Sequence, residues 1–145
     1  MGEYRLEFYK DDNGDEPARR WLREELSRMQ RLVVGTAMRE ILEEEGINVC
    51  GTGFGRQLGG GLFEFRVGGK LSDFVESFEG TRLPDEKILV RVFCHAHGDK
   101  LVLLLAAYDK LAQPSKAHQN QQIELARKRL RAWSSRQVRV RPTRR

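Results

Sequence analysis

The segment from residue 58 to residue 110 limits the possible folds most, because it holds three strand-like runs in close succession. Residues 62–67 read LFEFRV, and residues 88–97 divide in the same way into two sets of alternate positions. A period of two is typical of a strand with one buried face. Residues 101–108 are almost continuously apolar, which is typical of a central strand. The three runs together predict a small β-sheet.

Each run carries one cation at a position that alternation assigns to a common face of this sheet. These cations are Arg66, Arg91 and Lys110, and Tyr108 lies two residues before Lys110 on the same side. Convergent cations on one face of a sheet form a surface suited to phosphate groups. The pattern therefore indicates binding of RNA or DNA.

The remaining elements surround this sheet. Residues 4–9 alternate and predict a first strand, and two helical stretches follow, the second over about 31–45, which we expect to form an antiparallel hairpin. A last helix is predicted from about 116 to 133. The order β-α-α-β-β-β-α predicts an α+β fold, a small twisted antiparallel sheet with helices mainly against one face. The glycine-rich residues 50–61 are expected to form a flexible connection, and 68–87 a polar excursion that shields or gates the sheet face.

The positive charge is concentrated at the end of the chain. Residues 116–145 hold ten Lys and Arg against one acidic residue, a net +9, while residues 1–115 carry −4. Such a segment attracts polyanions. We expect one domain over 1–134 and a basic, disordered tail over 135–145.

Two absences narrow the class of protein. No apolar run approaches the ~18 residues that span a bilayer, so we expect no membrane association. Cys50 and Cys94 do not have the spacing of a zinc site, and two unframed cysteines fit a reducing cytoplasm.

In element order and in four segments, the chain resembles the RelE/ParE superfamily of bacterial toxins, most closely its HigB-like, phage-derived branch. The resemblance covers about residues 58–133. The matching segments are Leu62-Phe63-Glu64-Phe65-Arg66, Val90-Arg91-Val92-Phe93, Ala107-Tyr108-Asp109-Lys110 with Pro114-Ser115-Lys116, and Ile123-Glu124-Leu125-Ala126-Arg127.

The resemblance implies the toxin of a type II toxin–antitoxin system, an endoribonuclease that cleaves messenger RNA on the ribosome without metal or cofactor. Its partners would be mRNA, the ribosome and a helix-turn-helix antitoxin encoded beside it. Two alternatives remain open. One is a non-catalytic toxin of the same fold that poisons a protein such as a DNA topoisomerase. The other is a prophage binding module without toxicity.

Seven residues are predicted to form the site. Arg66 and Arg91 would bind phosphate, or instead pair with Glu64. Lys110 would bind phosphate or transfer a proton, or would instead be an ordinary exposed lysine. Tyr108 would stack on a base or bond a phosphate, or would instead be a rim aromatic that covers the core. In the basic C-terminal part we expect three further residues to contact RNA. They are Lys116, Arg127 and Arg131.

Three other residues have competing interpretations. Glu64 suits a general base, but a structural partner of an arginine is the favoured interpretation. His95 and His97 share a strand face and suit acid–base catalysis, a zinc site that lacks a third ligand, or an exposed strand end.

Overall fold

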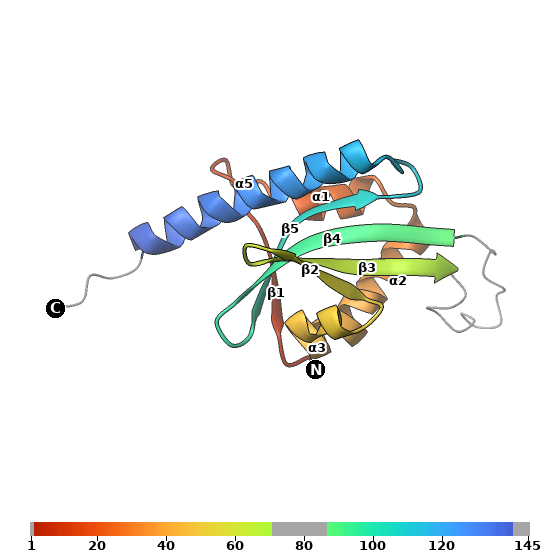
Figure 1. Ribbon diagram of the computed structural model, residues 1–145, viewed down its shortest axis with the longest axis horizontal. Coiled ribbons are helices and arrows are strands. Elements are labelled where there is room, and N and C mark those ends of the chain that lie inside the picture. The colour runs from red at the N-terminus through yellow and green to blue at the C-terminus, as the bar shows by residue number, and fades with distance from the viewer. Residues whose placement is uncertain (1, 71–86, 141–145) are drawn as a thin grey trace.

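The computed structural model describes residues 2–70 and 87–140, and their architecture is α+β, as predicted. Figure 1 shows the arrangement of the elements. The strands are β1 (Arg5–Phe8), β2 (Gly55–Gly59), β3 (Leu62–Lys70), β4 (Lys87–His97) and β5 (Leu101–Asp109). The helices are α1 (Pro17–Glu24), α2 (Arg28–Ala37), a π-helical turn (Met38–Leu42), α3 (Glu43–Glu45), a 3-10 helix (Gly46–Gly51) and α5 (Lys116–Val140).

The five strands form one mixed sheet in the order β1-β5-β4-β3-β2. The prediction of a purely antiparallel sheet was wrong, since β1 runs parallel to β5, with Arg5 opposite Leu101 and Phe8 opposite Leu104. The other neighbours are antiparallel. Strands joined by tight turns must be antiparallel, whereas β1 reaches β5 across most of the chain, so no local turn sets its direction.

The glycine-rich segment contains a strand that we did not predict. β2 pairs with β3, with Gly55 opposite Phe65, and Phe54 O accepts a hydrogen bond from Arg66 N at 2.7 Å. A Cβ on Gly55 would lie 2.7 Å from the backbone of Val49. The glycine therefore permits the 3-10 helix to pack closely on the strand, and the segment is not a free connection.

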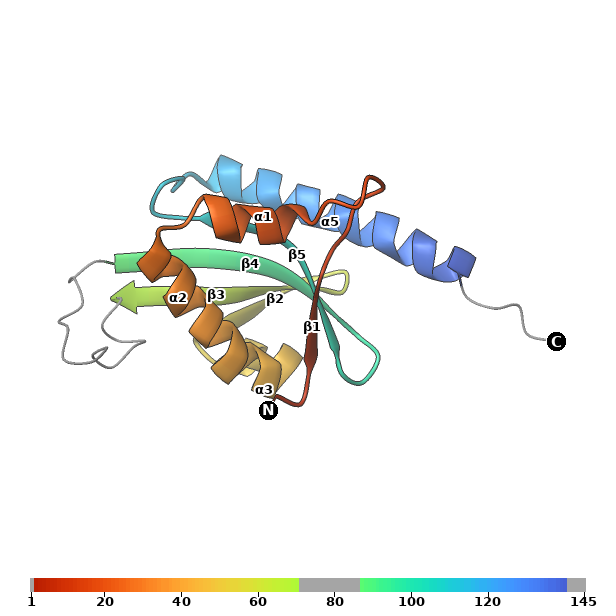
Figure 2. The same ribbon diagram turned by 180° about the vertical axis from the view of Figure 1, so that it is seen from behind.

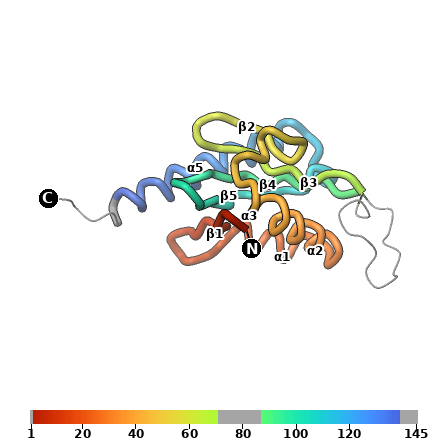
Figure 3. Tube along the Cα trace, turned by 90° about the horizontal axis from the view of Figure 1, so that it is seen from below, coloured from red at the N-terminus to blue at the C-terminus, as the bar shows by residue number. Residues whose placement is uncertain are grey.

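Helices cover both faces of the sheet, which corrects the expectation of helices mainly on one face. In Figure 3 the sheet lies between α5 on one side and α1 and α2 on the other. The α2 side holds the larger core, which includes the fully buried Phe63, Phe65, Val90 and Val92, as predicted. The α5 side holds a second core around Leu62, Phe93, Leu103, Leu105, Tyr108, Ala126 and Trp133.

The two N-terminal helices do not form the expected antiparallel hairpin. Figure 2 shows α1 and α2 at a steep angle to each other, each lying over the sheet. The chain breaks after α1 because Ser27 caps α2. Its hydroxyl accepts from Gln30 N at 3.1 Å, and the Gln30 side chain accepts from Ser27 N at 2.9 Å. This capping box was visible in the sequence as Ser27-x-x-Gln30 and was missed.

The last helix is longer than predicted. Residues 135–140, which we expected to be disordered, continue α5, while 141–145 lie outside the described residues. Trp133 is buried in the core of the α5 side, and the Arg136 guanidinium lies 5.2 Å from the centre of the Tyr9 ring. These contacts hold the helix against the body of the protein beyond Trp133.

Two expectations remain, one for the polar residues 68–87 and one for membrane-spanning helices. The polar excursion was expected over 68–87, but residues 68–70 continue β3 and Lys87 begins β4, and the two ends pair with each other. Its middle part, 71–86, lies outside the described residues. Within the described part of the chain, no helix has the length and apolar character needed to traverse a bilayer.

Candidate functional site

An irregularity in β5 determines which face carries Tyr108. Phe93 lies opposite Ala106, but its neighbour Cys94 lies opposite Leu104, so Leu105 is an extra residue in β5. Leu105 and Ala106 consequently both belong to the core of the α5 side. A one-residue bulge inverts the alternation beyond it. Tyr108 therefore lies on the α5 side, whereas strict alternation from Leu104 would have placed it on the α2 side.

The bulge completes a cross-strand row on three neighbouring strands. Arg66 of β3 lies directly opposite Arg91 of β4, and Arg91 lies opposite Tyr108 of β5. Residues directly opposite on neighbouring strands have Cβ atoms about 5 Å apart and interact through their side chains. The predicted residues Arg66, Arg91 and Tyr108 are thus brought together on one face, and we call them the Arg66–Arg91–Tyr108 row.

Glu64 holds the two arginines of this row together. Arg66 Nε donates a hydrogen bond to Glu64 Oε1 at 2.7 Å, and Arg91 Nε lies 3.6 Å from the same oxygen. The Glu64 side chain is completely buried, while the Arg66 side chain is 31% exposed. The structure therefore contains the ion pair that was the alternative interpretation of these arginines. It also agrees with the favoured role of Glu64 as their partner.

Helix α5 covers the row, so it does not lie on an open sheet face. Ser115 caps this helix through a hydrogen bond of 3.0 Å from His118 N to Ser115 Oγ. In the first turns, Gln119 Nε2 donates to Glu64 Oε2 at 3.3 Å, and the His118 ring lies 5.3 Å from that of Tyr108. Arg91 is 8% exposed and Tyr108 is 2% exposed. Arg66 is the member of the row most accessible to solvent.

Burial alters the acid–base properties of two residues in the row. It lowers the pKa of the Arg91 guanidinium from its usual value, an effect that Glu64 opposes and Arg66 and Arg56 reinforce. Arginine nevertheless stays protonated near neutral pH, because its usual pKa is so high. Burial, reinforced by Glu64, raises the pKa of the Tyr108 hydroxyl, while Arg91 opposes that rise. Tyr108 is therefore a neutral hydrogen-bond donor at physiological pH.

The row contains two buried polar atoms whose hydrogen bonding is incomplete within residues 2–70 and 87–140. Among the residues the structure describes, the buried Arg91 Nε and Tyr108 hydroxyl have no hydrogen-bond partner. A buried polar group without a partner costs free energy, about 1–3 kcal/mol in typical cases. Both groups are donors on a surface where three arginines (Arg56, Arg66 and Arg91) accompany one carboxylate. The arrangement is chemically suited to an anion.

Lys110 does not belong to the row itself. β5 ends at Asp109, and Lys110 follows it, with its backbone N–H donating to Leu89 O at 2.8 Å. The Asp109 carboxylate accepts from Leu111 N at 2.9 Å, which fixes the turn. Lys110 is half-buried and lies two residues beyond Tyr108 along the chain.

The three residues assigned to RNA binding in α5 differ in their surroundings. Lys116 is exposed in the first turn, and Arg131 is exposed farther along the helix. Arg127 instead donates from Nη1 to Gly59 O and from Nη2 to Leu58 O, both at 2.9 Å. These bonds give Arg127 a structural role at the turn between β2 and β3.

The two histidines lie away from the row, beside the second half of α5. His95 Nδ1 lies 2.7 Å from Gly61 O, and the His97 ring meets Trp133 edge to face at 4.8 Å. In residues 2–70 and 87–140, no group of three or more His, Cys, Asp and Glu side chains is placed to hold a metal ion. The histidines therefore have packing partners within the fold.

Three residues around the row were not assigned to the site from the sequence. Arg56 lies on β2 opposite Glu64, while Gln119 and His118 reach the row from α5. Arg56 was hidden because the glycine-rich segment was not recognised as a strand. His118 could have been found from the helix cap Ser115, which places it in the first turn above the end of β5.

No protein-family model and no curated protein sequence matches the chain.

Proposed function

We propose that this protein is the toxin of a type II toxin–antitoxin system and cleaves messenger RNA without a metal ion. The observation that carries the proposal is the Arg66–Arg91–Tyr108 row, in which cations meet buried donors that have no hydrogen-bond partner among the described residues. Ribosome-bound mRNA in the cytoplasm is the proposed substrate, and a helix-turn-helix antitoxin is the proposed partner.

The proposed reaction is attack of a ribose 2′-oxygen on the adjacent phosphorus. The P–O bond to the 5′-oxygen breaks, leaving a 2′,3′-cyclic phosphate on one fragment and, after proton transfer, a 5′-hydroxyl on the other. Charge accumulates on the non-bridging phosphate oxygens in the transition state. Fixed donors aimed at such charge commonly contribute a factor of about 10²–10³ to the rate.

The residues of the row have distinct roles in this proposal. Arg66 makes the first contact with the phosphate because it is the most exposed member. Arg91 and the Tyr108 hydroxyl then donate to the non-bridging oxygens, which supplies the hydrogen bonds that Arg91 Nε and this hydroxyl lack within the described residues. Glu64 is a positioning residue that keeps the two guanidinium groups side by side. Lys110 lies nearby for proton transfer.

The first experiment is inducible expression followed by mapping of RNA 5′ ends, together with cleavage of single-stranded RNA by purified protein in EDTA. We expect growth arrest, new 5′-hydroxyl ends and metal-independent cleavage. Arg91→Gln should lower cleavage at least a hundredfold while circular dichroism shows an intact fold. Arg5→Gln is the matched control, because Arg5 is exposed on β1 and pairs with Glu7 at 3.6 Å. Cleavage that is absent from the parent protein, or unchanged in Arg91→Gln, would refute the proposal.

One observation favours a second candidate, a toxin that binds and poisons a protein target. Arg91 and Tyr108 are almost fully covered by α5, so RNA cannot reach them without displacement of that helix or entry from the Arg66 side. A protein-poisoning toxin needs no such access. Growth arrest without new RNA ends, retained in Arg91→Gln, would support this candidate.

A further inference from the structure

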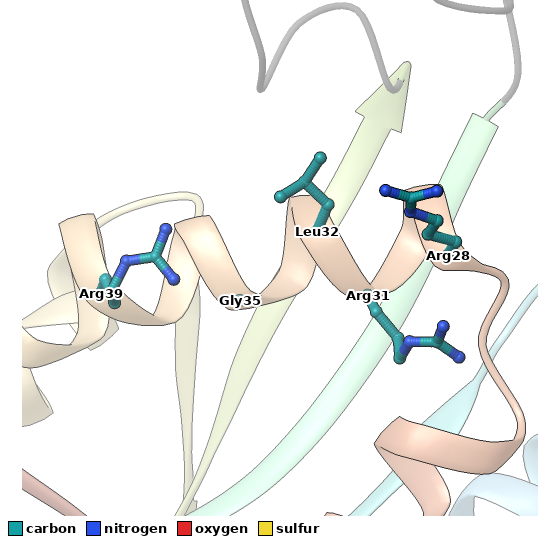
Figure 4. Close-up of a pocket in the computed structure, with 5 residues that line it drawn as sticks. All are labelled: Arg28, Arg31, Leu32, Gly35 and Arg39. Carbon is teal, nitrogen blue, oxygen red and sulfur yellow. The ribbon is translucent and has the colours of Figure 1, made fainter.

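A shallow groove lies on the outer side of α2, on the opposite face of the sheet from the Arg66–Arg91–Tyr108 row. Its volume is about 410 Å³. Figure 4 shows the side chains that line it, all from α2 and the turn that follows. They are Arg28, Arg31, Leu32, Gly35 and Arg39. We call this surface the α2 groove.

The charge of the α2 groove is entirely positive. No acidic residue occurs between Arg28 and Arg39 in the sequence, and in the described part of the chain no carboxylate lines the groove. Arg31 is fixed in place, because its Nη1 donates to Arg23 O at 2.8 Å and to Leu26 O at 3.0 Å. Arg28 and Arg39 are exposed at the two ends of the groove, as Figure 4 shows. They are eleven positions apart in the sequence, which is about 16 Å along a helix.

Gly35 lies between these arginines, and packing among the described residues does not account for it. A glycine inside a helix costs roughly 0.5–1 kcal/mol relative to alanine. Among the described residues outside the backbone of its own helix, a Cβ at Gly35 would meet Arg39 Nη1 alone, at 3.9 Å, and the backbone there needs no left-handed conformation. The described part of the fold would thus accept a side chain at this position. Gly35 is half-buried, and the missing side chain permits close approach of another backbone.

We propose that the α2 groove is a docking surface for an acidic amphipathic helix of a partner protein. Gly35 would lie at the crossing point, where helix axes can approach to about 8 Å. Leu32 supplies apolar contact beside it. Carboxylates near the two ends of a helix of about three turns would pair with Arg28 and Arg39.

The apolar centre of the groove favours a peptide over a nucleic acid. Phosphate groups would pair with the arginines, but they would gain nothing from Leu32 or from the missing side chain at Gly35. A helix with a small residue at its centre uses all three features. The proposal also stands apart from RNA cleavage, because the groove and the Arg66–Arg91–Tyr108 row lie on opposite faces of the sheet.

In the first step of the test, a displayed library of helix-forming 15-residue peptides is selected for binding to the full chain. Binding of the selected peptides, synthesised with a fluorophore, is then measured by anisotropy. We expect enrichment of peptides with acidic residues toward both ends and a small residue between them. The double variant Arg28→Gln/Arg39→Gln and the single variant Gly35→Leu should each weaken their binding at least tenfold. The double variant Arg5→Gln/Lys128→Gln is the charge-matched control, because Arg5 on β1 and Lys128 on α5 are exposed, and it should leave binding unchanged.

A stability measurement separates docking from folding. Gly35→Ala should raise the melting temperature by about 2–4 °C, because it removes the cost of a helical glycine, and should weaken peptide binding. A lower melting temperature would show that Gly35 serves the fold and would overturn the argument. So would selected peptides that bind all the variants equally. A third contrary result would be that Arg28→Gln/Arg39→Gln weakens binding of single-stranded RNA and leaves binding of acidic peptides unchanged. RNA cleavage should be unchanged in these variants. The result for the docking surface is then independent of the result for the proposed function.

Discussion

Replacing Glu64 with glutamine tests how the Arg66–Arg91–Tyr108 row is held together. The Glu64 carboxylate is fully buried and lies 2.7 Å from Arg66 Nε and 3.6 Å from Arg91 Nε. Gln119 of α5 also donates to it at 3.3 Å. Glu64→Gln keeps the shape of the side chain but leaves the buried Arg91 charge beside two other arginines without a carboxylate.

The expected loss of stability can be worked out from these contacts. Removing one member of a buried ion pair typically costs 3–5 kcal/mol. The contribution of Arg66 is reduced because its side chain is 31% exposed to solvent. A carboxamide oxygen also still accepts a hydrogen bond. We therefore expect Glu64→Gln to lower the free energy of unfolding by about 3 kcal/mol and the melting temperature by roughly 10 °C.

The assay is urea denaturation at neutral pH, followed by circular dichroism and by the fluorescence of Trp21 and Trp133. Arg91→Gln and the double variant Glu64→Gln/Arg91→Gln complete a double-mutant cycle. Because the double variant removes the buried charge along with its partner, it should lose about 1.5–3 kcal/mol less than the sum of the single variants. Losses that add within about 0.5 kcal/mol would refute the pairing of Glu64 with Arg91.

Three further predictions concern other parts of the structure. Tyr108→Phe should raise stability by about 1 kcal/mol at neutral pH, because the buried hydroxyl has no partner in the described residues. Since burial raises the pKa of Tyr108 in the folded state, its ionisation should destabilise the parent protein above a pH of about 10, and a phenylalanine variant should lose less stability in an alkaline titration. Arg127→Gln should cost about 1–3 kcal/mol and accelerate amide exchange in the β2–β3 turn, because two carbonyls there lose their donor; unchanged exchange would argue against this role. Ending the chain at residue 134 should lower stability by about 0.5–1 kcal/mol, because the Arg136 contact with Tyr9 is lost. The log–log slope of RNA binding against salt should also fall by roughly 0.7 per lost phosphate contact. An identical slope would show that this end of the chain does not contact RNA.

The strands of the centre of the sheet could be read from the sequence, because strand alternation is a property of a few neighbouring residues. Phe63, Phe65, Val90 and Val92 were expected on the buried face, and all four are fully buried. The same alternation placed Arg66 and Arg91 on the other face, where they lie directly opposite each other. These predictions needed only the period of two and the type of side chain.

Strand direction and the second edge of the sheet could not be read in this way. The parallel pairing of β1 with β5 joins segments about a hundred residues apart, and no local pattern fixes its direction. β2 reads GRQLG, and such a short sequence with glycine at both ends shows no alternation of apolar and polar side chains. Such pairing depends on which edge is left open when the rest of the chain has packed.

The chemistry of the site follows from residues that the sequence supplied and from an environment that it did not reveal. Arg66, Arg91 and Tyr108 were named from the sequence, but residues 101–108 are apolar up to Tyr108 and give no sign of the extra residue Leu105. That bulge brings Tyr108 beside Arg91, and α5 then buries both. Register and coverage arise from long-range packing, because each is set by how whole elements fit together and not by the side chains of any one segment.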